Sequence, residues 1–392
     1  MKRAALLAAA VAAVVTAGCG GSGSGSGGSW DGGSGGTASH AVTPPLTTSA
    51  STSGAAWGIV VMGGSAASED NFWQLFTRPA GSATWTLVTP PGVADNGGLV
   101  MASAGGGPLV VGVRPSQDLD FSPLATTGDD GRKWTAGLVD AGLADAADTL
   151  AVTSGGGPEF ALLGNGTIDR APSATAAESG SGWSKLATRG SVAASAPGKS
   201  CGLSSLDAIT ATSSGELLAG GACADSGVAG IFGYSGGTWH AAGPSLPGTV
   251  AGVQIQVLRL TATAAGNVAL LLAGPSLYAA WTSDGGAHWT VSPPLSLGSA
   301  EVSSAAFGAG VGVLLSTGKA ATVGGPGASW QQLPATPAGT AVLAFAPGSQ
   351  AEQAEALAVK NSKLTVWRLD ASASKWTSIQ TISVPIQYGS SS

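Results

Sequence analysis

Charged side chains are scarce in this chain of 392 residues: Asp, Glu, Lys and Arg together make up 10%, against about 25% in an ordinary soluble domain. This scarcity excludes a highly charged disordered tail. Long runs of helix formers are also missing, because 63 Gly and 21 Pro interrupt the chain throughout, and this excludes a helical bundle or coiled coil. A low-complexity Gly/Ala/Ser chain is not excluded by composition. The spacing of the 12 Trp residues therefore decides the fold class.

The N-terminal segment is typical of an export signal. Lys2 and Arg3 precede an apolar run over residues 4–15, which is too short to remain as a membrane span. The run ends in Thr16-Ala17-Gly18-Cys19, which resembles the lipobox of bacterial lipoproteins, although that family prefers an aliphatic residue where Thr16 stands. The resemblance implies cleavage before Cys19 and lipidation of its thiol. The alternative is ordinary secretory cleavage near Ala17.

Three segments follow from this interpretation. A signal peptide covers residues 1–18, the lipidated Cys19 and a flexible tether cover residues 19–45, and a folded domain covers residues 46–388. The tether is rich in Gly and Ser and nearly uncharged, so its root-mean-square reach is roughly 25–30 Å. Two or more acyl chains anchor a protein stably. We therefore predict a bacterial protein held by lipid at the extracytoplasmic face of the cell membrane.

The two remaining cysteines, Cys201 and Cys223, are expected to form a disulfide because this compartment is oxidising. Two separate free thiols are the alternative. Removal of Lys2 and Arg3 changes the net charge from −6 to −8, which argues against a nucleic-acid partner, since such a partner requires a basic surface. No metal-ligand spacing is present, so we expect no metal and no cofactor. We also expect the chain to be monomeric.

Tryptophan recurs with a period that indicates repeated structure. Successive members of the repeat lie 41 to 56 residues apart, a period typical of propellers and solenoids. The period that ends at Trp183 contains four short strand-like runs separated by turn signals such as Asn165-Gly166. Four strands per period, with no helical period, predict an all-β, seven-bladed β-propeller with four antiparallel strands per blade. Six or eight blades would require one period to be interpreted differently. The seven repeated positions are Trp85, Trp134, Trp183, Trp239, Trp289, Trp330 and Trp376.

Two of the turns that precede these tryptophans share a sharper pattern. Residues 127–134 and 282–289 both fit Ser/Thr-x-Asp-x-Gly-x-x-Trp, which resembles the Asp-box, or BNR repeat, of sialidase-like propellers. The resemblance implies structural roles: the Asp caps backbone amides, the Gly takes a conformation that a Cβ would forbid, and the Trp packs between blades. The other five turns keep the Trp and lose the Asp or its spacing. The pattern is carried by Thr127, Asp129, Gly131, Trp134, Thr282, Asp284, Gly286 and Trp289.

The catalytic set of the sialidase family is not recognisable in this sequence. That family uses three arginines to hold a carboxylate, a Tyr paired with a Glu, and an Asp as acid/base. Seven arginines follow the signal, none of them in an Arg-Ile-Pro-like motif, and only Tyr278 stands near the start of an expected third strand. We therefore predict no catalytic residues and no enzymatic activity, with a secreted sialidase-like glycoside hydrolase as the alternative.

Acidic residues gather in one class of loop. In a propeller, the loops from second to third strand and from fourth strand to the next first strand share one face. Because these loops contain several acidic residues, we expect this face to be acidic. An acidic face would suit a cationic or amine-bearing partner, or bind a divalent cation weakly. The alternative is that these loops carry the solubilising charge of an apolar chain. The candidate acidic binding face comprises Asp95, Asp118, Asp140, Asp145, Asp148 and Asp225.

Arg259 is unusual because it stands in an expected first strand, residues 257–261, close to the central channel. Strand alternation predicts Leu258 and Leu260 on one side and Arg259, with Val257, on the other. A buried arginine requires a partner or water. Three explanations remain open: a salt bridge, a channel water or a ligand contact.

These features predict a lipid-anchored propeller that acts as a non-catalytic binding or assembly platform at the cell envelope. Its partner is expected to be an unidentified protein or glycan of the envelope, because a propeller fold by itself specifies no chemistry.

Overall fold

The structure is a computed structural model of the chain. It describes residues 47–51 (backbone only), 55–62, 72–91, 98–104, 107–114, 119–143, 145–224, 227–246, 253–345, 354–370, 372 and 374–384. Cys19 and the predicted signal and tether lie outside this part, as do Asp95, Asp118 and Asp225. None of the helices in these residues is long and apolar enough to cross a membrane.

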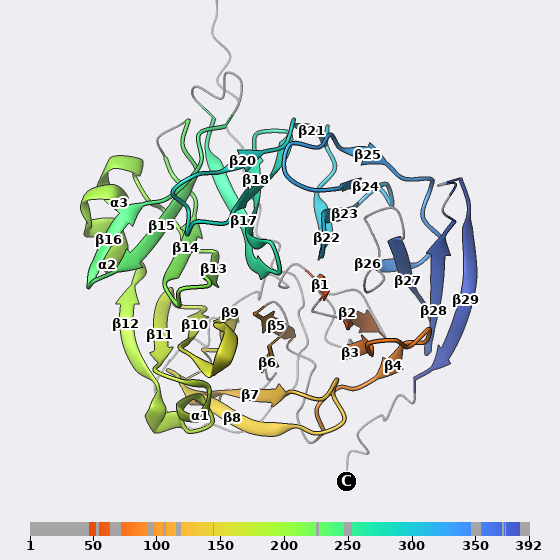
Figure 1. The fold of residues 1–392 in the computed structure, drawn as a ribbon, viewed down its shortest axis with the longest axis horizontal. Helices are drawn as coiled ribbons and strands as arrows, with labels where there is room; N and C mark the ends of the chain where they lie inside the picture. Colours follow the sequence, from red (N-terminus) through yellow and green to blue (C-terminus); the bar gives the residue numbers. More distant parts are fainter. Residues whose placement is uncertain are drawn as a thin grey trace, which may run out of the picture. The chain divides into compact units, whose positions relative to one another are not determined.

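Seven antiparallel sheets, each of four strands consecutive in sequence, form the seven-bladed β-propeller that the tryptophan period predicts (Figure 1). The first strands are β1 Thr47–Ser51, β5 Leu99–Ser103, β9 Ala147–Val152, β13 Ala208–Ala211, β17 Ile255–Thr263, β22 Val302–Phe307 and β26 Thr340–Phe345. The second strands are β2 Ala56–Met62, β6 Leu109–Val113, β10 Glu159–Leu163, β14 Leu217–Gly221, β18 Gly266–Ala273, β23 Val311–Leu315 and β27 Ala354–Lys360. The third strands are β3 Phe72–Arg78, β7 Phe121–Thr127, β11 Thr167–Ala171, β15 Gly230–Ser235, β19 Ser276–Thr282, β24 Ala320–Val323 and β28 Lys363–Leu369. The fourth strands are β4 Thr86–Leu87, β8 Thr135–Asp140, β12 Ser184–Thr188, β16 Thr238–Ala241, β20 Thr290–Val291, β25 Gln331–Gln332 and β29 Trp376–Ser383.

Two features depart from seven separate sheets. β1 pairs in parallel with β22, with Ser49 opposite Ala306, so blades 1 and 6 form one eight-stranded sheet. A short strand, β21 Leu295–Ser296, adds to the edge of blade 5 by pairing with β19. The turns between strands 1 and 2 and between strands 3 and 4 define the hairpin face of the propeller. The remaining connections define the connecting-loop face.

The core lies between the blades. The seven clusters of buried apolar side chains found in the described residues each join two neighbouring blades around the ring. Because both surfaces of a blade are covered, second strands such as β6 and β23 are buried along their full length. Small residues permit the close approach: a Cβ on Gly220 would lie 2.7 Å from Val257 of the next blade. Burial on both surfaces explains why so few positions carry charge.

The repeated tryptophans pack in the apolar clusters between neighbouring blades, and some of their indoles also donate a hydrogen bond to the preceding blade. The indole of Trp289 donates a hydrogen bond to the carbonyl of Ala242, which follows the fourth strand of blade 4. In the same way Trp330 donates to the Ser292 hydroxyl of blade 5, and Trp376 donates to the carbonyl of Pro334 in blade 6. The period in the sequence therefore reflects one inter-blade contact used repeatedly.

Short helices occur where the sequence showed no helical period. α1 Ala174–Ala177 lies between β11 and β12, and α2 Arg189–Ala194 and α3 Ala196–Cys201 connect blades 3 and 4; the 3-10 turns are η1 Ser154–Gly156 and η2 Gly180–Gly182. Local capping explains α2 and α3. Thr188 and Ser191 form a reciprocal capping box, and the Ser195 side chain accepts from the amide of Gly198. Such short helices depend on caps, so a search for a long apolar period does not find them.

Candidate functional site

A disulfide between Cys201 and Cys223 is present, as predicted, with a Cα–Cα distance of 5.2 Å. Cys201 is the last residue of α3, and Cys223 is fully buried just after β14. The bond therefore ties the connection between blades 3 and 4 to the second-to-third connection of blade 4, both on the connecting-loop face. Loops held in this way keep their positions relative to the blades.

The turn over residues 282–289 is held by hydrogen bonds among its own residues. The Thr282 hydroxyl donates to Asp284 Oδ1 at 2.8 Å, and the amide of Gly286 donates to Thr282 Oγ1 at 3.0 Å. Asp284 Oδ1 also accepts from the amide of His288. Gly286 has φ +92°, a conformation that L side chains rarely adopt. Capping by the His288 amide, together with a 2.6 Å contact to its ring, lowers the pKa of Asp284 to about 2.

The turn over residues 127–134 repeats these contacts in blade 2. The Thr127 hydroxyl donates to Asp129 Oδ1, which also accepts from the amide of Lys133, and this amide lowers the pKa of Asp129. Gly131 has φ +81°, and Trp134 packs against the cluster between blades 1 and 2. Both carboxylates are thus engaged by their own turns. Membership of the sialidase-like family stays a prediction.

Three members of the candidate acidic face lie in the described residues. Asp140 is exposed at the end of β8. Asp145 accepts a hydrogen bond from the Asn165 amide, and Asp148 pairs with Arg114 at 3.0 Å. Arg114 therefore neutralises part of the acidity of this region, and the sequence analysis assigned neither partner.

Burial raises the pKa of two carboxyls near this face. It raises the pKa of Asp148 above its ordinary value, although Arg114 opposes the shift. Burial also raises the pKa of Asp207, which accepts from the Ser205 hydroxyl. The negative charges of Asp145 and Asp207 add to the rise in the pKa of Asp148. Within the described residues, no group of three or more His, Cys, Asp or Glu is arranged to hold a metal ion.

The seven arginines beyond the signal are dispersed around the ring. Arg78 and Arg368 both bind Glu355, between blades 7 and 1. Arg114 of blade 2 pairs with Asp148 of blade 3, and Arg259 lies in the channel. Arg132, Arg170 and Arg189 are exposed. Tyr278 is 4% exposed and packs in the apolar cluster between blades 4 and 5. The described residues therefore do not bring three arginines together at Tyr278.

The predicted alternation around Arg259 is wrong. A β-bulge at Leu258 shifts the pairing of β17 with β18, so Val257 faces Leu271 while Arg259 faces Leu270. Leu258 packs toward blade 6 and Leu260 toward blade 4, on opposite sides. A bulge redirects the side chains that follow it. Arg259 consequently crosses the channel and donates to the carbonyl of Met101 in β5 at 3.4 Å.

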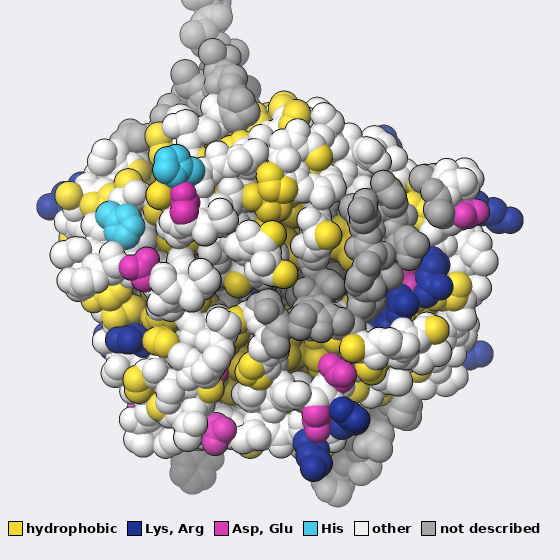
Figure 2. Space-filling view, in the orientation of Figure 1, with side chains coloured by type: hydrophobic (Ala, Val, Ile, Leu, Met, Phe, Trp, Pro, Cys, Tyr) yellow, Lys and Arg dark blue, Asp and Glu magenta, His cyan; other side chains and the backbone are white. Residues whose placement is uncertain are grey.

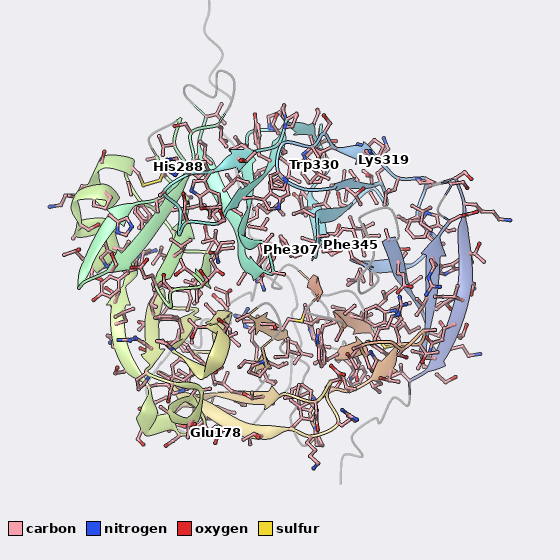
Figure 3. All side chains as sticks on the ribbon, in the orientation of Figure 1. Glu178, His288, Phe307, Lys319, Trp330 and Phe345 are labelled. Carbon is pink, nitrogen blue, oxygen red and sulfur yellow. A yellow bond between two sulfur atoms is a disulfide. The ribbon has the colours of Figure 1, made fainter. Side chains whose placement is uncertain are left out.

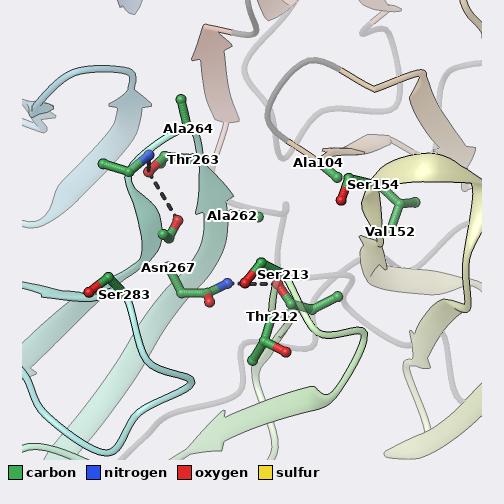
Figure 4. A pocket seen from close by; sticks show the side chains of 13 residues that line it. Ala104, Val152, Ser154, Thr212, Ser213, Ala262, Thr263, Ala264, Asn267 and Ser283 are labelled. Atoms are coloured by element: carbon green, nitrogen blue, oxygen red, sulfur yellow. Dashed lines mark hydrogen bonds between the residues drawn. The ribbon is translucent and has the colours of Figure 1, made fainter.

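A pocket of about 350 Å³ opens at the centre of the hairpin face (Figure 4). The first-to-second turns of blades 2 to 5 line it. Asn267 is fixed there, because its amide donates to Thr210 Oγ1 and to the carbonyl of Ala211. Its described lining has Ala, Val, Gly, Ser, Thr and Asn but no titratable side chain. The polar side chains that line it are Ser154, Thr212, Ser213, Thr263, Asn267 and Ser283.

A second pocket, of about 660 Å³, lies at blade 6 on the connecting-loop face. It is lined by the β21–β22 segment and the β23–β24 turn, and Lys319 is the one charged residue in its described lining (Figure 3). Figure 2 likewise shows that uncharged side chains dominate the face of the molecule it presents. Neither pocket therefore contains, in the described residues, the pair of carboxyls that a glycosidase requires.

No protein-family model and no curated protein sequence matches the chain. Several solved structures match the chain. A provisionally assigned 6-phosphogluconolactonase from Bacteroides fragilis matches with 14% identity over 83% of this chain and 94% of that chain, at a TM-score of 0.51. The GH74 xyloglucanase from Xanthomonas campestris matches with 12% identity over 84% of this chain and 52% of that one, at 0.50. YCF48 bound to a D1 peptide matches with 16% identity over 81% and 91%, at 0.46. At these identities the likeness shows the propeller fold alone.

Proposed function

We propose that this protein is a lipid-anchored, extracytoplasmic propeller that serves as a non-catalytic binding or assembly platform at the cell envelope. The observation that carries the proposal is the dispersal of the arginines. A sialidase must place three guanidinium groups on one carboxylate, because planar bidentate donors define that site. Here Arg78 and Arg368 are committed to Glu355, Arg114 to Asp148, and Tyr278 is buried between blades.

The pockets support the same proposal. General acid/base chemistry requires a titratable group within hydrogen-bond reach of the reacting atoms. The described lining of the hairpin-face pocket offers only hydroxyl, amide and apolar groups, and that of the blade 6 pocket adds Lys319 alone. Such surfaces can bind a partner through hydrogen bonds and shape.

A lipid anchor fits the sequence around Cys19 and the Gly/Ser tether that follows it. The Cys201–Cys223 disulfide also favours an oxidising compartment. In this setting the acidic face of blades 2 and 3, with Asp140 exposed at its edge, is the surface we propose for a cationic or amine-bearing envelope partner.

Anchoring is tested by Cys19→Ser. We expect the wild type to label with a fatty-acid analogue and to sediment with membranes, and the variant to lose both properties. A Cys201→Ser/Cys223→Ser variant is the control for a general effect of cysteine loss, and it should still label. Unchanged labelling and membrane retention of Cys19→Ser would overturn the anchor.

The enzyme alternative is tested with the full-length protein and a panel of fluorogenic glycosides that includes a sialoside. We expect no turnover above the buffer rate. Hydrolysis that increases with protein concentration and disappears on denaturation would overturn the non-catalytic proposal. The anchor would be unaffected by that result, so the two parts of the proposal fail separately.

A further inference from the structure

Arg259 is a buried charge without a counter-charge in the described part of the chain. It is 8% exposed, and its one hydrogen bond to a described residue is the 3.4 Å contact with the Met101 carbonyl. Burial lowers its pKa to about 10, and no carboxylate is among the causes of the shift. The guanidinium therefore stays charged at neutral pH. Burying an unpaired charge costs several kcal/mol, so a counter-charge from outside the chain would stabilise this arrangement.

A small cavity lies against the guanidinium. It measures about 10 Å³ and is lined by Arg259 together with Met101–Ser103 of blade 2, Leu150–Val152 of blade 3 and Thr210 of blade 4. The hydroxyl of Ser103 is buried there without a hydrogen-bond partner. Thr210 accepts from Asn267 and keeps its own hydroxyl proton to donate. Donors thus face this cavity from three blades, and its described lining contains no carboxylate.

The cavity adjoins the 350 Å³ pocket of the hairpin face, because Val152 and Ala262 line both. The size of the small cavity limits its occupant, since about 10 Å³ holds a single water or an ion of similar size. This small volume favours a monatomic anion over a carboxylate or phosphate group.

We propose that the central channel is a binding site for a monatomic halide, chloride in physiological conditions, held by the Arg259 guanidinium and the Ser103 and Thr210 hydroxyls and reached through the hairpin-face pocket. The ion supplies a counter-charge that the described residues do not provide, and it links blades 2, 4 and 5 across the channel. This site is independent of the proposed function, because a platform could bind its partner with or without it.

Bromide locates the site directly. Crystals of the wild-type protein are soaked in sodium bromide, and anomalous scattering is measured. We expect a peak in contact with the Arg259 guanidinium and the Ser103 hydroxyl, and a water alone at that place would overturn the proposal.

Thermal unfolding of the full-length protein provides the second test. At constant ionic strength, replacement of gluconate by chloride is expected to raise the melting temperature of the wild type saturably, by about 2–4 °C at tenfold excess over the dissociation constant. Arg259→Met should lose this rise, whereas the exposed Arg170→Met should keep it. A rise retained in Arg259→Met, or absent from the wild type, would contradict the site.

Discussion

The indole nitrogen of Trp85 donates a 2.7 Å hydrogen bond to Oε2 of Glu355, joining the first blade to the last. Glu355 is completely buried, and its other oxygen accepts from Arg78 of blade 1 and Arg368 of blade 7. The two ends of the repeat pair no strand with each other in the described residues, because each blade consists of four consecutive strands. Side chains therefore help to close the ring: here the repeated tryptophan finds a buried carboxylate, whereas Trp289 and Trp376 find a backbone carbonyl.

Loss of this closing carboxylate should destabilise the propeller strongly. Glu355→Gln leaves the partly buried Arg78 and Arg368, whose side chains are 12% and 34% exposed, without their counter-charge. Breaking a fully buried pair costs about 3–5 kcal/mol, so the loss here is at most that amount. We expect a corresponding fall in the free energy of unfolding, measured by urea denaturation. Glu216→Gln, at an exposed position, is the matched control and should change it by less than about 0.5 kcal/mol. Equal stability of the two variants would show that the closure rests on apolar packing alone.

Glu159 should make stability depend on pH. It is 4% exposed between blades 2 and 3, and burial, with Glu178 nearby, raises its pKa from 4.5 to about 7. The folded protein therefore binds a proton that the unfolded chain releases, so the free energy of unfolding falls as pH rises from 4.5 to 7. The contribution of this residue is at most about 3 kcal/mol. Glu159→Gln should flatten that part of the profile in urea melts between pH 4.5 and 8, whereas an unchanged slope would refute the assignment.

The capped turn of blade 5 should tolerate an amide but not a methyl group at Asp284. Asp284→Ala removes the acceptor for the Thr282 hydroxyl and the His288 amide, and we expect the melting temperature to fall by a few degrees. Asp284→Asn keeps an acceptor at Oδ1, so its melting temperature should fall less. Calorimetry of both variants measures the difference, and a larger effect of Asn than of Ala would contradict the capping role.

Reduction of the disulfide should loosen one region without changing the fold. Cys201 and Cys223 are 22 positions apart in sequence, and closing a loop of this length stabilises by about 3 kcal/mol on the chain-entropy model. The Cys201→Ser/Cys223→Ser variant should have a free energy of unfolding lower by that amount, measured by urea denaturation. Hydrogen exchange should increase mainly in α2, α3 and β14. Uniform exchange around the whole ring would indicate a different role.

The blade count could be predicted from the sequence because one contact repeats. Each outer strand needs a large side chain that packs against the preceding blade, and tryptophan meets that need. Trp289 and Trp330 also find a hydrogen-bond acceptor in that blade. The disulfide could also be predicted, since two cysteines remain for an oxidising compartment. Local rules that act at each repeat leave a periodic trace in the sequence.

Long-range contacts leave no such trace. The direction of the Arg259 side chain depends on a bulge at Leu258, which shifts the alternation of the strand by one position. No turn residue in the sequence of this strand indicates the bulge. The hydrogen bond between Trp85 and Glu355 joins positions 270 residues apart along the chain. The pairing of Asp148 with Arg114 is similarly set by the packing of blades 2 and 3. Exposed acids such as Asp140 could be placed on a face, but their neutralising partners could not.

The platform proposal is tested most directly by crosslinking in intact cells. Wild-type protein, the charge-reversed variant Asp118→Lys/Asp140→Lys/Asp145→Lys and a control, Glu178→Lys/Glu216→Lys/Asp370→Lys, with reversals on the hairpin face, are crosslinked, purified and analysed by mass spectrometry. We predict that the wild type and the control give the same envelope partner, with crosslinks in blades 2 and 3, and that the acidic-face variant loses it. Crosslinks that are absent from the wild type, or that persist unchanged when the acidic face is reversed, would contradict the account.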